Sequence, residues 1–184
     1  AFIALVLFFI KRYTKYHILP EIFDKLGVII TVAAQINLFL LGCEIFKEFY
    51  SNSHHALSAK YLFFGLGEHK ALVPWIWTSI TLNILTTAIL TIHKFRKIPA
   101  VFFSCCVVLF MAIWVEKGLG LIVPGFIPSP QGQIVEYFPS LTEISITLGV
   151  ISIGLIVMTC LVRVAIPIEL GELNCQKRDF DWRK

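Results

Sequence analysis

Residues 98–115 read IPAVFFSCCVVLFMAIWV, an uncharged stretch of 18 residues that ends at Glu116 and Lys117. A helix needs about 20 apolar residues to cross the hydrocarbon core of a bilayer, so this stretch has the length of a membrane span. Because the backbone must satisfy its own hydrogen bonds in lipid, such a run is expected to be helical. Three further uncharged runs have comparable length: residues 26–43, 71–92 and 144–162. The predicted fold class is all-α, a polytopic transmembrane helical bundle.

Composition supports a membrane location for the whole chain. Of its 184 residues, 57% are hydrophobic and 15% are charged, far from the average of soluble domains. Residues 1–10 form a partial span without a basic leader, so we expect a helix already under way and a missing N-terminal part of the subunit. We predict a single helical membrane domain over residues 1–184, with spans at about 1–10 (partial), 26–46, 72–93, 98–116 and 143–163 and a cytoplasmic tail at 164–184.

Lysine and arginine residues alternate between dense and sparse loops. Residues 11–25, 93–97 and 164–184 are rich in them. Residues 116–143 hold a single lysine, and residues 47–70 hold three lysines over a longer stretch. Basic loops stay preferentially on the cytoplasmic side, so the first three segments and the C-terminus are expected to be cytoplasmic and the other two outside.

Four carboxylates stand at the outer ends of the predicted spans: Glu44, Glu48, Glu116 and Glu143. Interfacial charge is cheap, so these groups can simply mark the water boundary, above all Glu48 and Glu143. Glu44 and Glu116 directly adjoin apolar runs, where a carboxylate needs a partner. Lys117 is a candidate partner for Glu116. Neighbours in sequence do not face each other on a helix, however, so this pairing is expected between helices.

The five histidines and five cysteines are the candidate metal ligands and proton carriers of the chain. His54 and His55 form a pair that can change charge near neutral pH, with a solvated interfacial pair as the simpler alternative. No HxH or HExxH spacing occurs, so no metal site is predicted. The cysteines show no CxxC or ferredoxin spacing, and the histidines lie in loops or at helix ends. The chain is therefore expected to hold neither an iron–sulfur cluster nor a haem.

Three amides, Gln35, Asn37 and Asn83, lie near the middle of the predicted spans. Hydrogen bonding between helices is their simpler role. A polar path for protons is the alternative, although no Asp, Glu or Lys at mid-depth completes it. Trp75 and Trp77 are expected in the interfacial belt of the membrane.

Several stretches together resemble the NrfD/PsrC family of integral membrane subunits, over about residues 44–171. The pairing of EKG with PGFIPSP is the most specific of these features, and the apolar runs are the least. The stretches are EIFKEFY at 44–50, HHALSAKYLFFGLG at 54–67, LVPWIWT at 72–78, EKGLGLIVPGFIPSPQG at 116–132 and VAIPIELG at 164–171.

The resemblance implies a helical subunit of a prokaryotic cytoplasmic membrane that holds no haem or cluster of its own. It implies electron exchange between menaquinone and a ferredoxin-like iron–sulfur subunit on the outer face, in a complex with other membrane and cytoplasmic subunits. No nucleic-acid partner is expected. Members of the family contain two related four-helix bundles, with the quinone pocket assigned to the first. This chain resembles mainly the second, C-terminal bundle, so it can lack residues that contact menaquinone.

Candidate residues divide by role, and no catalytic residue is assigned. The apolar loop at 120–132, which is rich in Gly and Pro, is expected to be buried under the partner, with insertion into the lipid headgroups as the alternative. Glu116 is the preferred carboxylate for accepting a proton. The docking candidates are Trp75, Ile122, Phe126, Ile127 and Pro128, and the proton-handling candidates on the quinone side are Glu44, Glu48, His55, Glu116, Lys117 and Glu143.

We therefore expect a membrane subunit of a menaquinol/menaquinone oxidoreductase complex, which acts as an enzyme only together with its partners. A structural anchor for the iron–sulfur subunit is an alternative that the sequence does not separate from it. A secondary transporter is disfavoured, because no predicted span has a central Gly or Pro interruption together with charge.

The charge distribution leads to a test of orientation. A cysteine placed at Ser129 is expected to react with an impermeant thiol reagent in whole cells, whereas the position of Gln176 is expected to stay protected. Labelling in the opposite pattern would invert the predicted topology.

Overall fold

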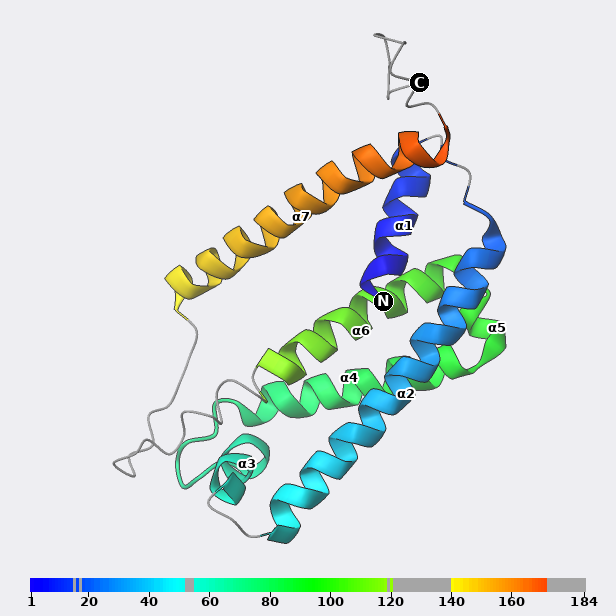
Figure 1. The fold of residues 1–184 in the computed structure, drawn as a ribbon. Coiled ribbons are helices and arrows are strands. Elements are labelled where there is room, and N and C mark those ends of the chain that lie inside the picture. Colours follow the sequence, from blue (N-terminus) through cyan, green and yellow to red (C-terminus); the bar gives the residue numbers. More distant parts are fainter. Residues whose placement is uncertain (15, 17, 52–54, 119, 121–139, 172–184) are drawn as a thin grey trace. The chain divides into compact units, whose positions relative to one another are not determined.

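The computed structural model describes residues 1–14, 16, 18–51, 55–118, 120 and 140–171, and its regular structure there is helical (Figure 1). The all-α class is confirmed for these residues. Four helices, α2, α4, α6 and α7, are long and apolar enough to cross a membrane. The elements are α1 (Phe2–Tyr13), α2 (Pro20–Ser51), α3 (His55–Phe64), α4 (Val73–Thr91), α5 (His93–Arg96), α6 (Pro99–Lys117) and α7 (Leu141–Glu169).

Two helices, α2 and α7, extend beyond the spans predicted from the apolar runs. Helix α2 has 32 residues and extends beyond the predicted span 26–46 at both ends. Helix α7 continues through residues 164–169, which the sequence analysis assigned to the cytoplasmic tail. Short helices also occupy two predicted loops, because α3 lies within 47–70 and α5 within 93–97. The extension of α2 runs into polar residues at both ends, whereas α7 continues past Arg163 into a further apolar stretch. Hydropathy therefore locates the apolar run but not the ends of the hydrogen-bonded helix.

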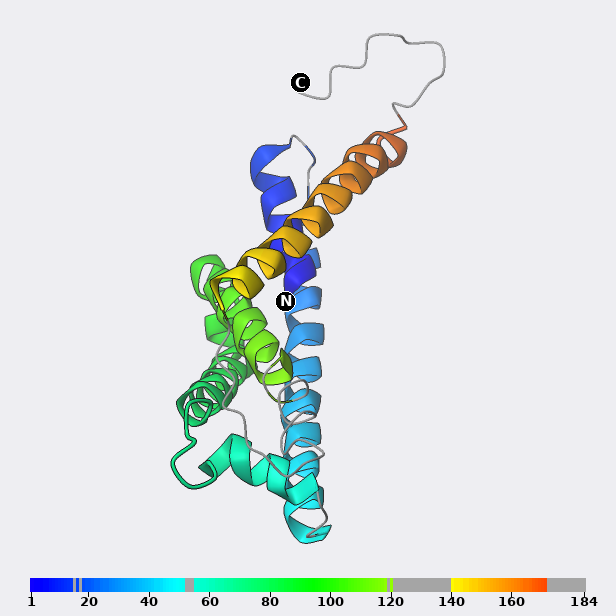
Figure 2. The same ribbon diagram turned by 90° about the vertical axis from the view of Figure 1, so that its left-hand side faces the viewer.

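The chain divides into two compact units, where the sequence analysis predicted one domain. The first unit contains Ala1–Phe9 and Ile18–Tyr137, and the second contains Ile10–His17 and Phe138–Lys184. Within the first unit α4 and α6 lie side by side, connected by the short helix α5 (Figure 1 and Figure 2). Short connections of this kind favour antiparallel neighbours, and this helix pair carries the site described below.

Helix α3 closes one end of the first unit over α2 and α4. Tyr61 of α3 is almost fully buried, and the Trp77 ring N–H of α4 donates a hydrogen bond to the Phe63 carbonyl at 2.9 Å. Gly65 follows α3 with a positive φ of 78°, a backbone conformation that favours glycine. The apolar cluster at this end contains Leu41, Tyr61, Leu62, Phe63, Leu72, Ile76 and Ile80.

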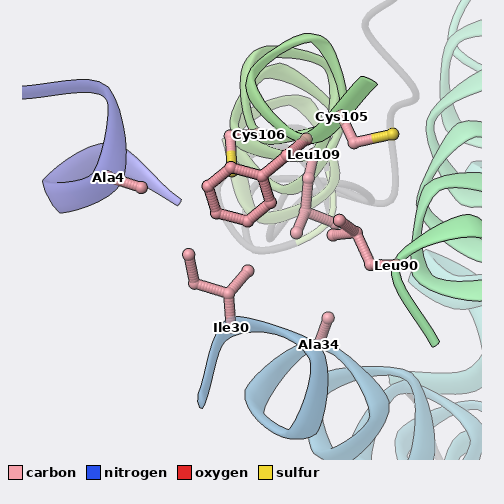
Figure 3. Close-up of a cluster of buried hydrophobic side chains, with 8 residues drawn as sticks. Ala4, Ile30, Ala34, Leu90, Cys105, Cys106 and Leu109 are labelled. Carbon is pink, nitrogen blue, oxygen red and sulfur yellow. The ribbon is translucent and has the colours of Figure 1, made fainter. Parts of the chain in front are cut away.

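A second apolar cluster joins α1, α2, α4 and α6 (Figure 3). Its side chains converge from four helices, and small residues such as Ala4 and Ala34 allow a close approach. The cluster contains Ala4, Ile30, Ala34, Leu90, Phe102, Cys105, Cys106 and Leu109.

The turn between α4 and α6 contacts α2 through the side chains of Arg96 and Thr31. The Arg96 guanidinium donates to the Leu90 carbonyl at 3.2 Å, and the Thr31 hydroxyl of α2 approaches the same carbonyl at 3.3 Å. The Arg96 stem crosses α2 at Gly27, where a Cβ would lie 2.9 Å from Arg96 Cδ. The missing side chain at Gly27 thus leaves room on α2 for the Arg96 side chain.

A matched pair of glycines on α2 tests this contact. We expect Gly27→Leu to displace Arg96 and lower stability by about 1–3 kcal/mol, the usual range for overpacking. Gly42→Leu is the control, since a Cβ there meets nothing within 4 Å. Thermal unfolding in detergent should show a lower midpoint for the first variant only. Equal midpoints would contradict a tight contact at Gly27.

Candidate functional site

One face of α4 is polar although the whole helix is apolar enough to span a membrane. Ser79, Asn83, Thr86 and Thr87 are spaced by four, three and one residues, which places them on one side of a helix with 3.6 residues per turn. All four side chains are buried, and Asn83 has no exposed surface. Buried polar groups need hydrogen-bond partners, so this face defines where α4 must meet polar atoms of a neighbour.

Helix α6 supplies those partners. The Ser79 hydroxyl donates to the Ala112 carbonyl at 2.5 Å. One turn further along each helix, the Asn83 amide nitrogen donates to Glu116 Oε2 at 2.8 Å. Glu116 is only 2% exposed, so its carboxylate lies inside the helix pair rather than at the water boundary. A hydrogen bond accepted by a carboxylate is stronger than one between two neutral groups.

Lys117 completes the site from the same helix as Glu116. Its ammonium lies 3.1 Å from Glu116 Oε1, and its side chain is 37% exposed. The expectation that this pairing would be between helices is therefore wrong. The lysine stem is long enough to curl back beside its neighbour while the charged end stays accessible. The distance defines an ion pair, but the geometry makes no hydrogen bond, and Oε1 has no hydrogen-bond donor among the described residues.

The two oxygens of Glu116 thus have different surroundings. Oε2 is held by the Asn83 amide, whereas Oε1 has the positive charge of Lys117 nearby and an unused acceptor position among the described residues. A carboxylate oxygen accepts more than one hydrogen bond. Oε1 therefore has acceptor capacity that no described group uses, although the atom itself is buried, while Asn83 fixes the other oxygen.

Two further carboxylate candidates lie on α2. Glu44 is exposed, and Glu48 is half-buried. Glu48 Oε2 is shielded and has no hydrogen-bond partner among the described residues. Glu48, which sequence reasoning placed at a water boundary, is thus the more enclosed of the two.

Glu143 has a local role in the second unit. Its side chain accepts from the Ser140 backbone N–H at 2.7 Å, and the Ser140 hydroxyl accepts from the Glu143 N–H at 3.3 Å. This reciprocal pair is a capping box at the start of α7. The sequence Ser-Leu-Thr-Glu contains the signal for such a cap, which the sequence analysis did not use.

The remaining candidates are only partly described. His55 is the first residue of α3, and its side chain lies outside the described atoms. Trp75 is exposed on α4. The docking candidates Ile122, Phe126, Ile127 and Pro128 all lie outside the described residues.

The mid-span amides have separate surroundings. Asn83 bonds to Glu116, and Gln35 of α2 donates to the Thr91 hydroxyl at 3.0 Å. Asn37 Nδ2 is buried and has no partner among the described residues. Two of the three amides therefore make side-chain bonds between helices. The predicted interhelical role is therefore confirmed for Gln35 and Asn83. The spacing of the polar face of α4 was a further signal, which sequence reasoning did not use.

The class of protein follows from the fold. Four helices that can span a bilayer and a carboxylate paired inside them define a multi-pass helical membrane protein. No group of three metal-ligating side chains occurs among the described residues. Comparisons with protein-family models, curated proteins and solved structures find no match for this chain.

A double-mutant cycle tests the bond between α4 and α6. Asn83→Leu leaves the buried carboxylate without its donor, and Glu116→Leu leaves the buried amide without its acceptor. The double variant removes both polar groups, so its loss of stability should be smaller than the sum of the single losses by about 1–3 kcal/mol. Thermal unfolding in detergent measures all four proteins. Additive losses would mean that the two side chains do not interact.

Proposed function

We propose that this chain is part of a membrane subunit of a respiratory menaquinol/menaquinone oxidoreductase complex of the NrfD/PsrC type. Its role is to pass electrons between the quinone pool and an iron–sulfur subunit on the outer face of a prokaryotic cytoplasmic membrane. The observation that carries the proposal is the buried Glu116, whose Oε2 is fixed by Asn83 and whose Oε1 has no hydrogen-bond donor among the described residues. The motif EKGLGLIVPGFIPSPQG, in which Glu116 is the first residue, supports the family.

The stretches that resemble the family also suggest a particular type of subunit within it. They resemble DsrP, the quinone-interacting membrane subunit of the DsrMKJOP complex, and then HmcC-type subunits. This similarity favours a role in sulfur or sulfate respiration. The partners are then a ferredoxin-like iron–sulfur subunit and further membrane and cytoplasmic subunits of the same complex. The C-terminus is proposed to lie in the cytoplasm.

Quinone chemistry gives the carboxylate its task. Oxidation of one quinol releases two electrons and two protons, and reduction takes up the same numbers. In the oxidative direction Glu116 Oε1 would accept a hydrogen bond from a quinol hydroxyl and take one of the two protons. The second proton would leave to another group or to water, and the two electrons would pass to the partner's cluster. Asn83 keeps Oε2 in place, and the Lys117 ammonium lies beside Oε1. In the reductive direction the same group returns the proton.

A structural anchor remains the second candidate because the same contacts also serve assembly. Asn83 holds the end of α6 against α4, and Lys117 balances the buried charge within the EKG segment. In that case the iron–sulfur subunit is held here while the quinone reacts elsewhere in the complex.

The substitution Glu116→Gln separates the two candidates. Glutamine keeps the shape of the side chain and an oxygen that accepts from Asn83, but it cannot take the proton. In the intact complex, menaquinol-dependent reduction of the partner's cluster is expected to fall by about 10²-fold or more, the usual contribution of a general base. Assembly and cluster content should not change. Glu21→Gln, at an exposed position of α2 outside the candidate set, is the matched control.

Full menaquinol-dependent activity of the Glu116→Gln complex would remove this residue from the chemistry and favour the anchor. Loss of the iron–sulfur subunit from that complex would likewise assign Glu116 to assembly.

A further inference from the structure

Most threonines in the described helices share one hydrogen-bond pattern. A helical Thr hydroxyl commonly donates to the carbonyl four residues earlier, which satisfies it within its own helix. Thr31, Thr78, Thr81, Thr86, Thr91, Thr147 and Thr159 all make this bond, at 2.6–2.9 Å. Thr87 departs from it. Its hydroxyl points to the side-chain oxygen of Asn83, Oδ1, at 3.4 Å.

The direction of this contact matters because an asparagine amide has two different ends. The NH₂ group only donates and the oxygen only accepts, and the two have nearly the same shape. If the amide turned over, Oδ1 would face the Glu116 carboxylate, and two acceptors would repel each other in a buried place. A hydroxyl that donates to Oδ1 stabilises the orientation in which Nδ2 faces Glu116.

Burial strengthens the preference for this orientation of the Asn83 amide. Thr87 is 4% exposed and Asn83 has no exposed surface, so bulk water does not compete for either amide end. The chain of donation runs in one direction, from the Thr87 hydroxyl to Asn83 Oδ1 and from Asn83 Nδ2 to Glu116 Oε2. Each donor in such a chain polarises the next, which strengthens the final bond to the carboxylate.

We propose that Thr87 is a positioning residue, which holds the Asn83 amide with its NH₂ group toward Glu116 and so leaves Oε1 as the oxygen that accepts a proton. Thr87 touches neither the carboxylate nor the reacting hydroxyl in this scheme. Its effect on turnover rests on the proposed function, whereas its effect on the carboxylate itself does not.

Neighbouring threonines provide matched variants for the experiment. Thr87→Val removes the hydroxyl and keeps the shape, and Thr87→Ser restores a hydroxyl. Thr86→Val is the control, because the Thr86 hydroxyl donates only to the backbone carbonyls of Leu82 and Asn83. If Thr87→Val does not assemble, Thr87→Ala makes the same comparison.

Infrared difference spectroscopy of the assembled complex gives the first measurement. The carboxylate stretching bands of Glu116 are identified as those lost in Glu116→Gln. At one fixed pH, Thr87→Val is expected to shift these bands in the same direction as Asn83→Leu, and Thr87→Ser is expected to return them toward the original position. Thr86→Val should leave them in place. Unshifted bands in Thr87→Val, or an equal shift in Thr86→Val, would overturn the positioning role.

Turnover gives the second measurement. Losing one neutral hydrogen bond should lower menaquinol-dependent cluster reduction in Thr87→Val by about threefold to tenfold, with recovery in Thr87→Ser. A shifted band with turnover unaffected in both Thr87→Val and Glu116→Gln would keep the positioning role and reject the proposed function. A lowered rate without a band shift would reject the positioning role alone.

Discussion

The hydrogen bond from Asn83 to Glu116 is the interaction on which the first unit depends. A carboxylate enclosed between two apolar helices is expensive unless it is paired, and the amide and the neighbouring ammonium provide that pairing. Together with the bond from Ser79 to the Ala112 carbonyl, it sets how far α6 slides along α4. The hydrocarbon clusters on either side are compatible with many small displacements, whereas these polar contacts are compatible with few.

The same interaction gives the site its chemical asymmetry. One oxygen of Glu116 is held by a donor from the opposite helix, and the other is beside a cation whose side chain is partly exposed. A symmetric environment would leave both oxygens equally ready to accept a proton, with no defined direction for a substrate. The proposed proton acceptor therefore owes its direction to α4, although the residue itself is on α6. This dependence connects helix packing with the proposed quinone chemistry.

Local features of the sequence indicate helices and a cap, whereas contacts between distant segments were not predictable from it. The spans of α4 and α6 followed from run length, because the bilayer thickness sets how many apolar residues a helix needs. The cap at Ser140 was also readable, since Ser and Glu three residues apart form a local motif. By contrast, α3 lies in a predicted loop, and its apolar surface is buried against α2 and α4. Its packing was not visible in a stretch of ten residues.

The sequence by itself determined that four helices can span a bilayer and that Glu116 needs a partner, because both follow from the cost of placing polar groups in hydrocarbon. Only the tertiary structure decided which partner it has. Asn83 is 33 residues away, and whether it meets Glu116 depends on the register and rotation of two helices. Register and rotation arise from the sum of many packing contacts, and no local stretch encodes that sum.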